Sequence, residues 1–178
     1  MIEINVTDSG ALAALNRLIS GIQNTEPAMR AIGEYIMELS KRSFEKSASP
    51  SGVRWAPNTQ TTILQYLEQT GGNYRRDGRL SVKGAQRATG KKPLIGQSRD
   101  LSRQFSYVAD GNSVTISNTM AYAAMHQFGG TRAQFPHLWG NIPARPFMPV
   151  DAGGALDDAA ARHAVSAVED YINSLTGR

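Results

Sequence analysis

The chain has 178 residues, a formal net charge of +4 and no cysteine. Its length suits one domain, residues 1–178, with its own hydrophobic core, and the lack of cysteine excludes disulfide frameworks and thiolate zinc sites. The N-terminus has no basic region or long apolar run, and no window approaches the roughly 20 apolar residues of a membrane span, so we expect neither a signal peptide nor a membrane partner.

The N-terminal quarter has the pattern of a short strand followed by two helices. Ile2, Ile4 and Val6 alternate with polar residues, which predicts a half-buried strand. A first helix is predicted from apolar residues at helical spacing: Leu12, Leu15, Leu18, Ile19 and Ile22. Thr25-Glu26-Pro27 then resembles the start of a second helix, whose apolar stripe comprises Met29, Ile32, Ile36, Leu39 and Phe44.

A basic segment follows a turn-rich loop and a short helix predicted over residues 61–67. Residues 71–92 are polar and contain glycine, and we expect them to form a mobile loop because they have little apolar surface to bury. One acid, Asp77, opposes seven basic residues: Arg75, Arg76, Arg79, Lys83, Arg87, Lys91 and Lys92. The segment therefore has a net charge of +6, and the rest of the chain −2.

The C-terminal half predicts a hairpin, two helices and an extended arm. Residues 103–109 and 113–118 flank the turn signal Asp110-Gly111-Asn112. A short helix over residues 121–128 stops at Gly129-Gly130, and residues 141–150, which contain three prolines, form a stiff extended segment that we call the proline arm. A final helix begins within residues 151–158. The expected class is α+β, with two N-terminal helices and a C-terminal helix packed on a small, mostly antiparallel sheet.

No pattern in the sequence indicates catalysis. The glycines of residues 84–92 have the wrong spacing for a phosphate-binding loop, and there is no G-x-S-x-G nucleophile turn. His126, His137 and His163 lack the spacing of zinc ligands. We therefore expect no enzymatic activity, no metal and no cofactor, and a packing or hydrogen-bonding role for His126.

The proline arm and its surroundings supply the candidate interaction residues: Arg145, Phe147, Phe128, Trp139 and Trp55. Aromatic and arginine side chains are enriched where proteins meet, although Trp139 and Phe147 fit the core of this domain equally well. Pro146 biases Arg145 toward an extended backbone, which fixes the direction of its guanidinium group. Two roles follow for Arg145: an anchor on a neighbouring subunit, or a brace within the chain, for example near Gly129-Gly130.

The basic segment has three interpretations. Its cations could contact nucleic acid, with Tyr74 stacking on a base. They could instead dock on an acidic protein neighbour, or the segment could be an inert, solvated insertion.

Three motifs in this order resemble the phage virion morphogenesis family, the Mu-like tail-completion proteins of tailed phages. They are R-W-A-P-N-T at residues 54–59, K-P-L-I-G-Q-S-R-D-L at 92–101, and Y-A-A-M-H-Q-F-G-G at 122–130 followed by I-P-A-R-P-F at 142–147. Arg99 stands where that family usually has glycine, and residues 62–91 are longer than usual.

The resemblance implies a structural protein of phage or prophage assembly that acts at tail completion or head–tail joining. It implies action by protein–protein binding, as a homo-oligomeric ring that contacts other tail or connector proteins. It also implies a location in the bacterial host cytoplasm during assembly and then in the virion. The alternative from the residues alone is a nucleic-acid-binding module that uses residues 71–92.

Overall fold

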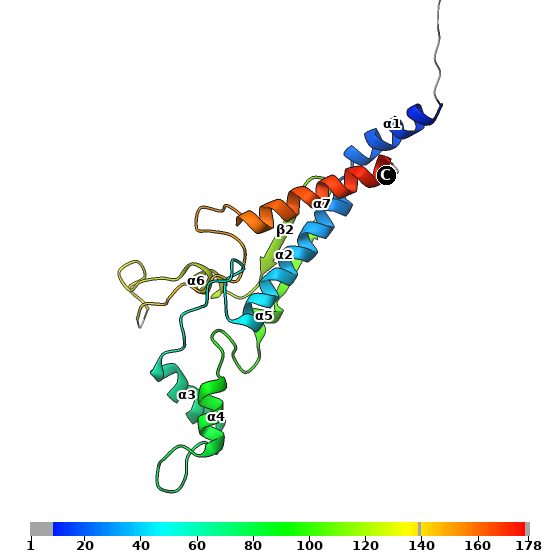
Figure 1. Ribbon diagram of the computed structural model, residues 1–178. Helices are drawn as coiled ribbons and strands as arrows, with labels where there is room; N and C mark the ends of the chain where they lie inside the picture. The colour runs from blue at the N-terminus through cyan, green and yellow to red at the C-terminus, as the bar shows by residue number, and fades with distance from the viewer. Residues whose placement is uncertain (1–8, 139, 177–178) are drawn as a thin grey trace, which may run out of the picture.

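The computed structural model describes residues 9–138 and 140–176 of an elongated molecule (Figure 1). The strand predicted at Ile2, Ile4 and Val6 lies outside these residues, as does Trp139. In chain order the elements are α1 (Ser9–Ile22), α2 (Glu26–Lys46), α3 (Gln60–Thr70), α4 (Val82–Gly90), α5 (Asp100–Arg103), β1 (Phe105–Ala109), β2 (Val114–Asn118), α6 (Ala123–Phe128) and α7 (Asp158–Thr176). The α+β class is confirmed.

The longest helix, α2, begins where the sequence predicts. Pro27 occupies its first turn, where an amide donor is not needed, and Glu26 forms an ion pair with Arg30 one turn later. Thr25 does not cap the helix through its side chain, because its hydroxyl donates to the carbonyl of Gly111 in the hairpin turn. This contact joins the start of α2 to the tip of the β-hairpin.

The hairpin packs on α2. β1 and β2 pair antiparallel, with Tyr107 opposite Ile116, and the face that carries Tyr107 is the more buried one. A Cβ atom at Gly33 of α2 would lie 2.6 Å from the Tyr107 ring, so glycine permits this close approach. The predicted hairpin is therefore confirmed.

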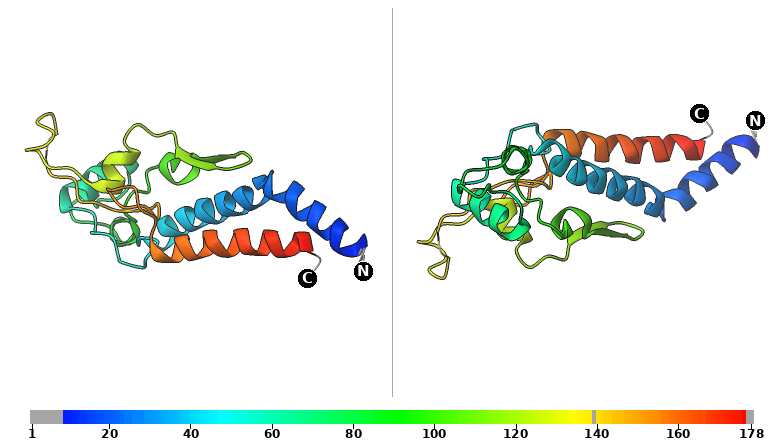
Figure 2. Two further views of the ribbon diagram at one scale, coloured as in Figure 1. Left: turned by 90° about the horizontal axis from the view of Figure 1, so that it is seen from above. Right: turned by 90° about the horizontal axis from the view of Figure 1, so that it is seen from below.

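The helices are not all layered on the sheet as expected. α7 packs against α2 and α1, while α2 packs against the hairpin, so α2 lies between α7 and the sheet (Figure 2). Tyr35 of α2 stacks on His163 of α7, with ring centroids 3.5 Å apart. The sheet has two strands, and its small face accommodates one long helix.

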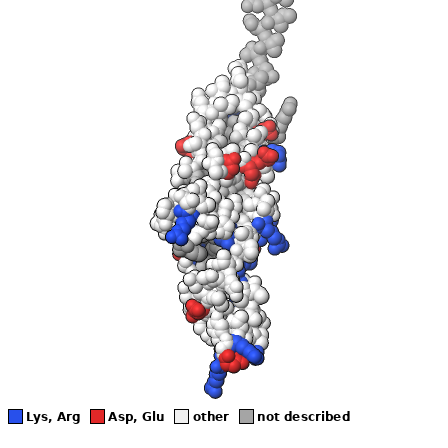
Figure 3. Space-filling model, turned by 90° about the vertical axis from the view of Figure 1, so that its left-hand side faces the viewer, with Lys and Arg blue, Asp and Glu red and all other residues white. Residues whose placement is uncertain are grey.

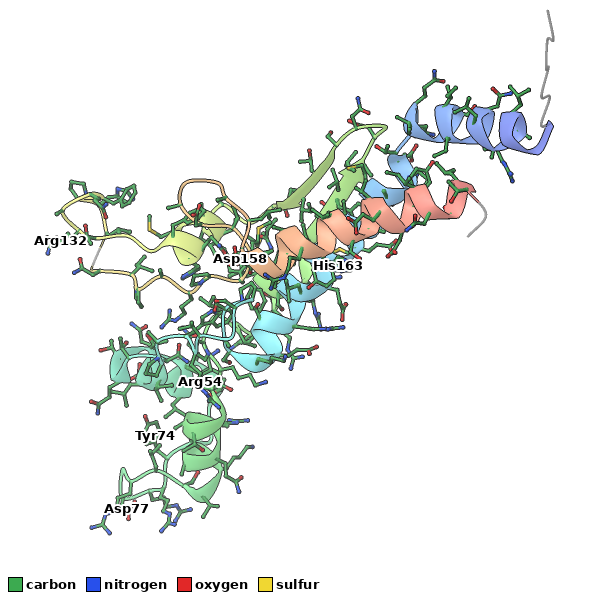
Figure 4. The ribbon with its side chains drawn as sticks, turned by 45° about the horizontal axis from the view of Figure 1, so that its top comes forward. Arg54, Tyr74, Asp77, Arg132, Asp158 and His163 are labelled. Carbon is green, nitrogen blue, oxygen red and sulfur yellow. The ribbon has the colours of Figure 1, made fainter. Side chains whose placement is uncertain are left out.

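The prediction of a mobile loop over residues 71–92 is wrong for its second half. Ser81 caps α4 by accepting a hydrogen bond from the Gly84 amide at 3.1 Å, and Gly84 is buried against the backbone of Asn73. Tyr74 and Leu80 form a bridge that closes a turn around Asp77, at the end of the molecule farthest from α1 (Figure 4). The segment packs through glycine and buried Asn73, which an apolar count overlooks.

The core lies where α2, β1 and the proline arm meet. Phe44, Trp55, Phe105 and Phe147 are buried together, and the Phe44 ring lies 5.4 Å from Trp55 and 5.2 Å from Phe147. Leu101, from the second family-like motif, belongs to the same cluster. Segments distant in the sequence thus share one hydrophobic cluster.

Candidate functional site

The proline arm is clasped to residues 54–59 by partly buried hydrogen bonds. The indole Nε1 of Trp55 donates to the carbonyl of Pro146 at 2.8 Å. In the opposite direction, Arg145 donates from Nε to the carbonyl of Ala56 at 2.9 Å and from Nη2 to that of Pro57 at 3.0 Å. The motifs around Trp55 and Arg145, about 90 residues apart in sequence, are therefore one structural unit.

Gln127 holds the other side of the arm and was not among the residues predicted from the sequence. Its Oε1 accepts from the amides of Phe147 and Met148, and its Nε2 donates to the carbonyls of Met148 and Val150. The side chain thus replaces a neighbouring strand for a segment whose prolines limit sheet pairing. A glutamine between His126 and Phe128, shortly before the glycine pair, was the only signal available.

The glycine pair brings the chain close to the arm. Gly130 and Ile142 form an isolated antiparallel bridge through two backbone hydrogen bonds. Gly129 has a φ of +75°, and a Cβ atom there would lie 2.8 Å from the amide nitrogen of Ala144. Glycine is required both for the left-handed backbone and for this contact.

The candidate interaction residues separate into two groups. Arg145, Phe147 and Trp55 are buried in the subunit, so they do not form the surface anchors that the sequence suggested. For Arg145 the geometry fits the internal brace, with Ala56 and Pro57 as the partners in place of Gly129-Gly130. Phe128 is exposed and is available to a partner, whereas Trp139 lies outside the described residues.

His126 lies beside this clasp with an unpaired ring nitrogen. Its backbone carbonyl accepts from the Arg145 amide at 2.8 Å, while its buried Nδ1 has no hydrogen-bond partner. Burial lowers the pKa of His126, and the nearby positive charge of Arg145 lowers it further. Burial also lowers the pKa of Arg145, which remains a cation at neutral pH.

The seven basic residues of the 71–92 segment do not form one surface. Arg75, Arg76 and Arg79 surround Asp77 at the tip of the molecule, where Figure 3 shows basic and acidic side chains together. Lys83 is exposed on α4. Arg87 folds back and donates from Nη1 to Thr70, Gly71 and Asn73, so it stabilises the segment itself.

Lys91 and Lys92 contribute to a separate basic cleft at the other end of α4. The cleft has a volume of about 810 Å³ and lies between the end of α2, α3, the end of α4 and α5. Its charged lining residues are Lys41, Glu45, Lys91, Lys92, Arg99 and Arg103. It therefore has five cationic side chains and one acidic side chain among the described residues that line it.

The apolar stripe of α1 is exposed. Leu12, Leu15, Ile19 and Ile22 recur at a spacing of three and four residues, and each is between 48% and 59% accessible. The helix packs on α7 through its other side, where Gly21 contacts Leu175. The surface of α1 that faces away from α7 therefore has no partner within the described part of the chain.

The described residues contain neither a metal-binding cluster nor a membrane-spanning helix. Residues 9–138 and 140–176 contain no group of three or more His, Cys, Asp or Glu side chains that could hold a metal ion. Within the same ranges, no helix is both long and apolar enough to cross a bilayer.

Comparison with known proteins gave one match. A family model described as the phage virion morphogenesis family matches residues 6–165, which include all of the motifs of the clasp. No curated protein and no solved structure matches the chain.

Proposed function

The chain belongs to the phage virion morphogenesis family, which gives it a structural role in phage assembly, and from this premise we propose that it acts at tail completion or head–tail joining. It does so by binding to copies of itself and to other tail or connector proteins, without catalysis. It works in the cytoplasm of the bacterial host and then remains in the virion.

The exposed stripe of α1 is the observation that carries this proposal. Leu12, Leu15, Ile19 and Ile22 together expose an apolar surface along three turns of one helix. Contiguous apolar patches of this kind on soluble proteins are typical of interaction sites. The spacing matches the seam along which helices pack against one another.

A second copy of the chain is the partner that this stripe fits best. Arg17 is the only charged residue of α1, so the surface offers little for charge-based recognition of an unrelated protein. Interfaces between identical subunits are more apolar and poorer in charge than those of transient complexes. Docking of α1 on a different patch of the next subunit would produce a head-to-tail contact, which closes into a ring when the rotation allows it.

Light scattering over a range of protein concentrations tests the proposal. The parent should form a discrete oligomer, and Leu15→Glu/Ile19→Glu should shift it to the monomer, because two carboxylates would be buried at the contact. Both side chains are exposed in the subunit, so the circular dichroism spectrum should not change. The matched control is Val82→Glu, at an exposed apolar residue of α4, at the opposite end of the molecule from α1 (Figure 1), which should leave the mass unchanged.

Two results would contradict the proposal. One is a parent protein that stays monomeric at every concentration, both alone and mixed with tail or connector proteins of its phage. The other is an oligomer whose mass is the same for the parent and for Leu15→Glu/Ile19→Glu.

A further inference from the structure

We propose that the basic cleft binds an acidic peptide segment of a partner protein, with glutamate or aspartate side chains interspersed with apolar ones. This inference goes beyond self-association, and it rests on the proposed function only in expecting the partner to be another virion protein. The cleft lies between α2, α3 and α5, whereas the stripe proposed for self-association lies on α1, so the two sites can be tested separately.

Three cations of the cleft are unpaired. Lys41, Arg99 and Arg103 line the cleft, and within the described ranges their side chains make no hydrogen bond or ion pair. By contrast, Arg30 and Arg42 form ion pairs with Glu26 and Glu38. Three cations that face one cleft without an ion pair favour an anionic ligand, because each can form a charge-assisted hydrogen bond at no cost to an existing one.

Hydrogen bonds hold Lys91 and Lys92 of the cleft in place. Lys92 donates from Nζ to the carbonyl of Glu45 at 2.7 Å. Lys91 donates to the carbonyl of Ile95, and its Nζ lies 4.7 Å from the centroid of the Tyr66 ring. Cations positioned before binding lose less side-chain entropy when a ligand arrives. The cleft is therefore partly organised as a positive site.

The lining of the cleft fits a peptide better than a nucleic acid. Sites for single-stranded nucleic acid combine a positive groove with aromatic faces on which bases stack. Phe44 is buried within the core, and the ammonium group of Lys91 covers a face of Tyr66. The walls instead include Ile95, which suits aliphatic side chains. A volume of about 810 Å³ accommodates a short peptide segment.

Fluorescence anisotropy with three labelled probes tests the inference. The probes are a peptide that alternates glutamate with leucine and alanine, the same peptide with lysine in place of glutamate, and a single-stranded oligonucleotide of equal net charge to the first. The parent should bind the glutamate peptide, and Lys41→Gln/Arg103→Gln should weaken that binding roughly tenfold. The matched control, Arg75→Gln/Arg76→Gln, removes equal charge from the tip and should change the affinity by less than about twofold.

Three results would overturn the inference. The first is a parent that does not bind the glutamate peptide, or that binds the lysine peptide equally well. The second is equal weakening by the cleft and tip variants, which would make the attraction a property of net charge. The third is preferential binding of the oligonucleotide that depends on Lys41 and Arg103. Lys41→Gln/Arg103→Gln should keep the oligomeric mass of the parent. Failure of the peptide-binding inference is therefore distinguishable from failure of the proposed self-association.

Discussion

Gln127 and Phe147 are joined by a buried hydrogen bond in which the Phe147 amide donates to Oε1 of Gln127 at 2.9 Å. The same side chain makes three further hydrogen bonds to the backbone of Met148 and Val150. These contacts place the Phe147 ring in the core, 5.8 Å from that of Phe105. The short helix α6 thus positions the proline arm through one side chain.

We predict that Gln127→Ala lowers the free energy of unfolding by about 2–4 kcal/mol, because it leaves buried donors and acceptors of the arm unpaired. Gln127→Glu should be more harmful, since a carboxylate would face the carbonyls of Met148 and Val150. Urea unfolding measures both. Gln86→Ala, at an exposed position of α4, is the control and should change stability by less than about 0.5 kcal/mol. A parent-like midpoint for both Gln127 variants would contradict the assigned role.

Arg145 should behave as a brace. Arg145→Lys keeps the charge but loses the two-armed contact with Ala56 and Pro57, and we expect it to lower the free energy of unfolding by about 1–3 kcal/mol. Thermal melting measures this, and the particle mass should stay normal well below the lowered melting temperature. Arg132→Lys, in the exposed loop at the far end of the arm (Figure 4), is the control. Normal melting with lost assembly would instead identify Arg145 as an interface anchor.

The local features of this fold could be predicted from the sequence. Pro27 at the start of α2 and Asp110-Gly111-Asn112 between the strands act through their own backbone preferences, so short-range patterns reveal them. The helix α4 was missed because its stability comes from contacts between Gly84, Asn73 and Arg87. Such contacts leave no periodic apolar pattern.

The site was harder to predict because its partners are distant in sequence. Trp55 and Pro146 are joined by a hydrogen bond across 91 positions, and no local pattern shows that Trp55 turns inward. Aromatic residues beside prolines occur both at interfaces and in cores, so the sequence does not distinguish the two. Burial in the structure separates Phe147 from exposed Phe128. The basic cleft was likewise hidden, since Lys41 lies on a helix far from Lys91 and Arg103 in the chain.

Stability should fall as the pH decreases below about 6.5, the ordinary pKa of histidine. Burial and Arg145 lower the pKa of His126 in the folded state, so the unfolded chain binds a proton first. The resulting loss of folding stability is absent above the pKa of His126 in the unfolded chain, and it grows as the pH falls toward the pKa of His126 in the folded protein. Melting temperatures between about pH 7.5 and 5 should show it, and His126→Gln should flatten the profile relative to the control His137→Gln, an exposed position. If the melting temperature depends on pH equally in the parent, His126→Gln and His137→Gln, the titration of His126 does not affect stability.

Limited proteolysis should distinguish the tip from the rest of the basic segment. Trypsin is expected to cut first after Arg75, Arg76 or Arg79, which are exposed in the turn around Asp77. Arg87 should be protected, because α4 and three hydrogen bonds hold it. Mass spectrometry of the first fragments identifies the sites. Early cleavage after Arg87 would mean that the whole of 71–92 is mobile in solution.

Variants of Arg99 should separate effects on folding stability from effects on binding of the glutamate peptide. It precedes α5 with a φ of 60°, a left-handed conformation that costs a residue with a Cβ about 1 kcal/mol, and it lines the basic cleft without a partner of its own. Arg99→Gly removes both the backbone cost and the charge. It should therefore unfold at the same or a higher temperature than the parent, while binding the glutamate peptide several-fold more weakly. Arg99→Lys keeps the cost and the charge and should change neither property by much. If Arg99→Gly lowers stability, the side chain supports the fold. If Arg99→Gly leaves the affinity for the glutamate peptide unchanged, Arg99 is not part of the binding site. Binding in the cleft would then not explain why arginine occupies a left-handed position that suits glycine.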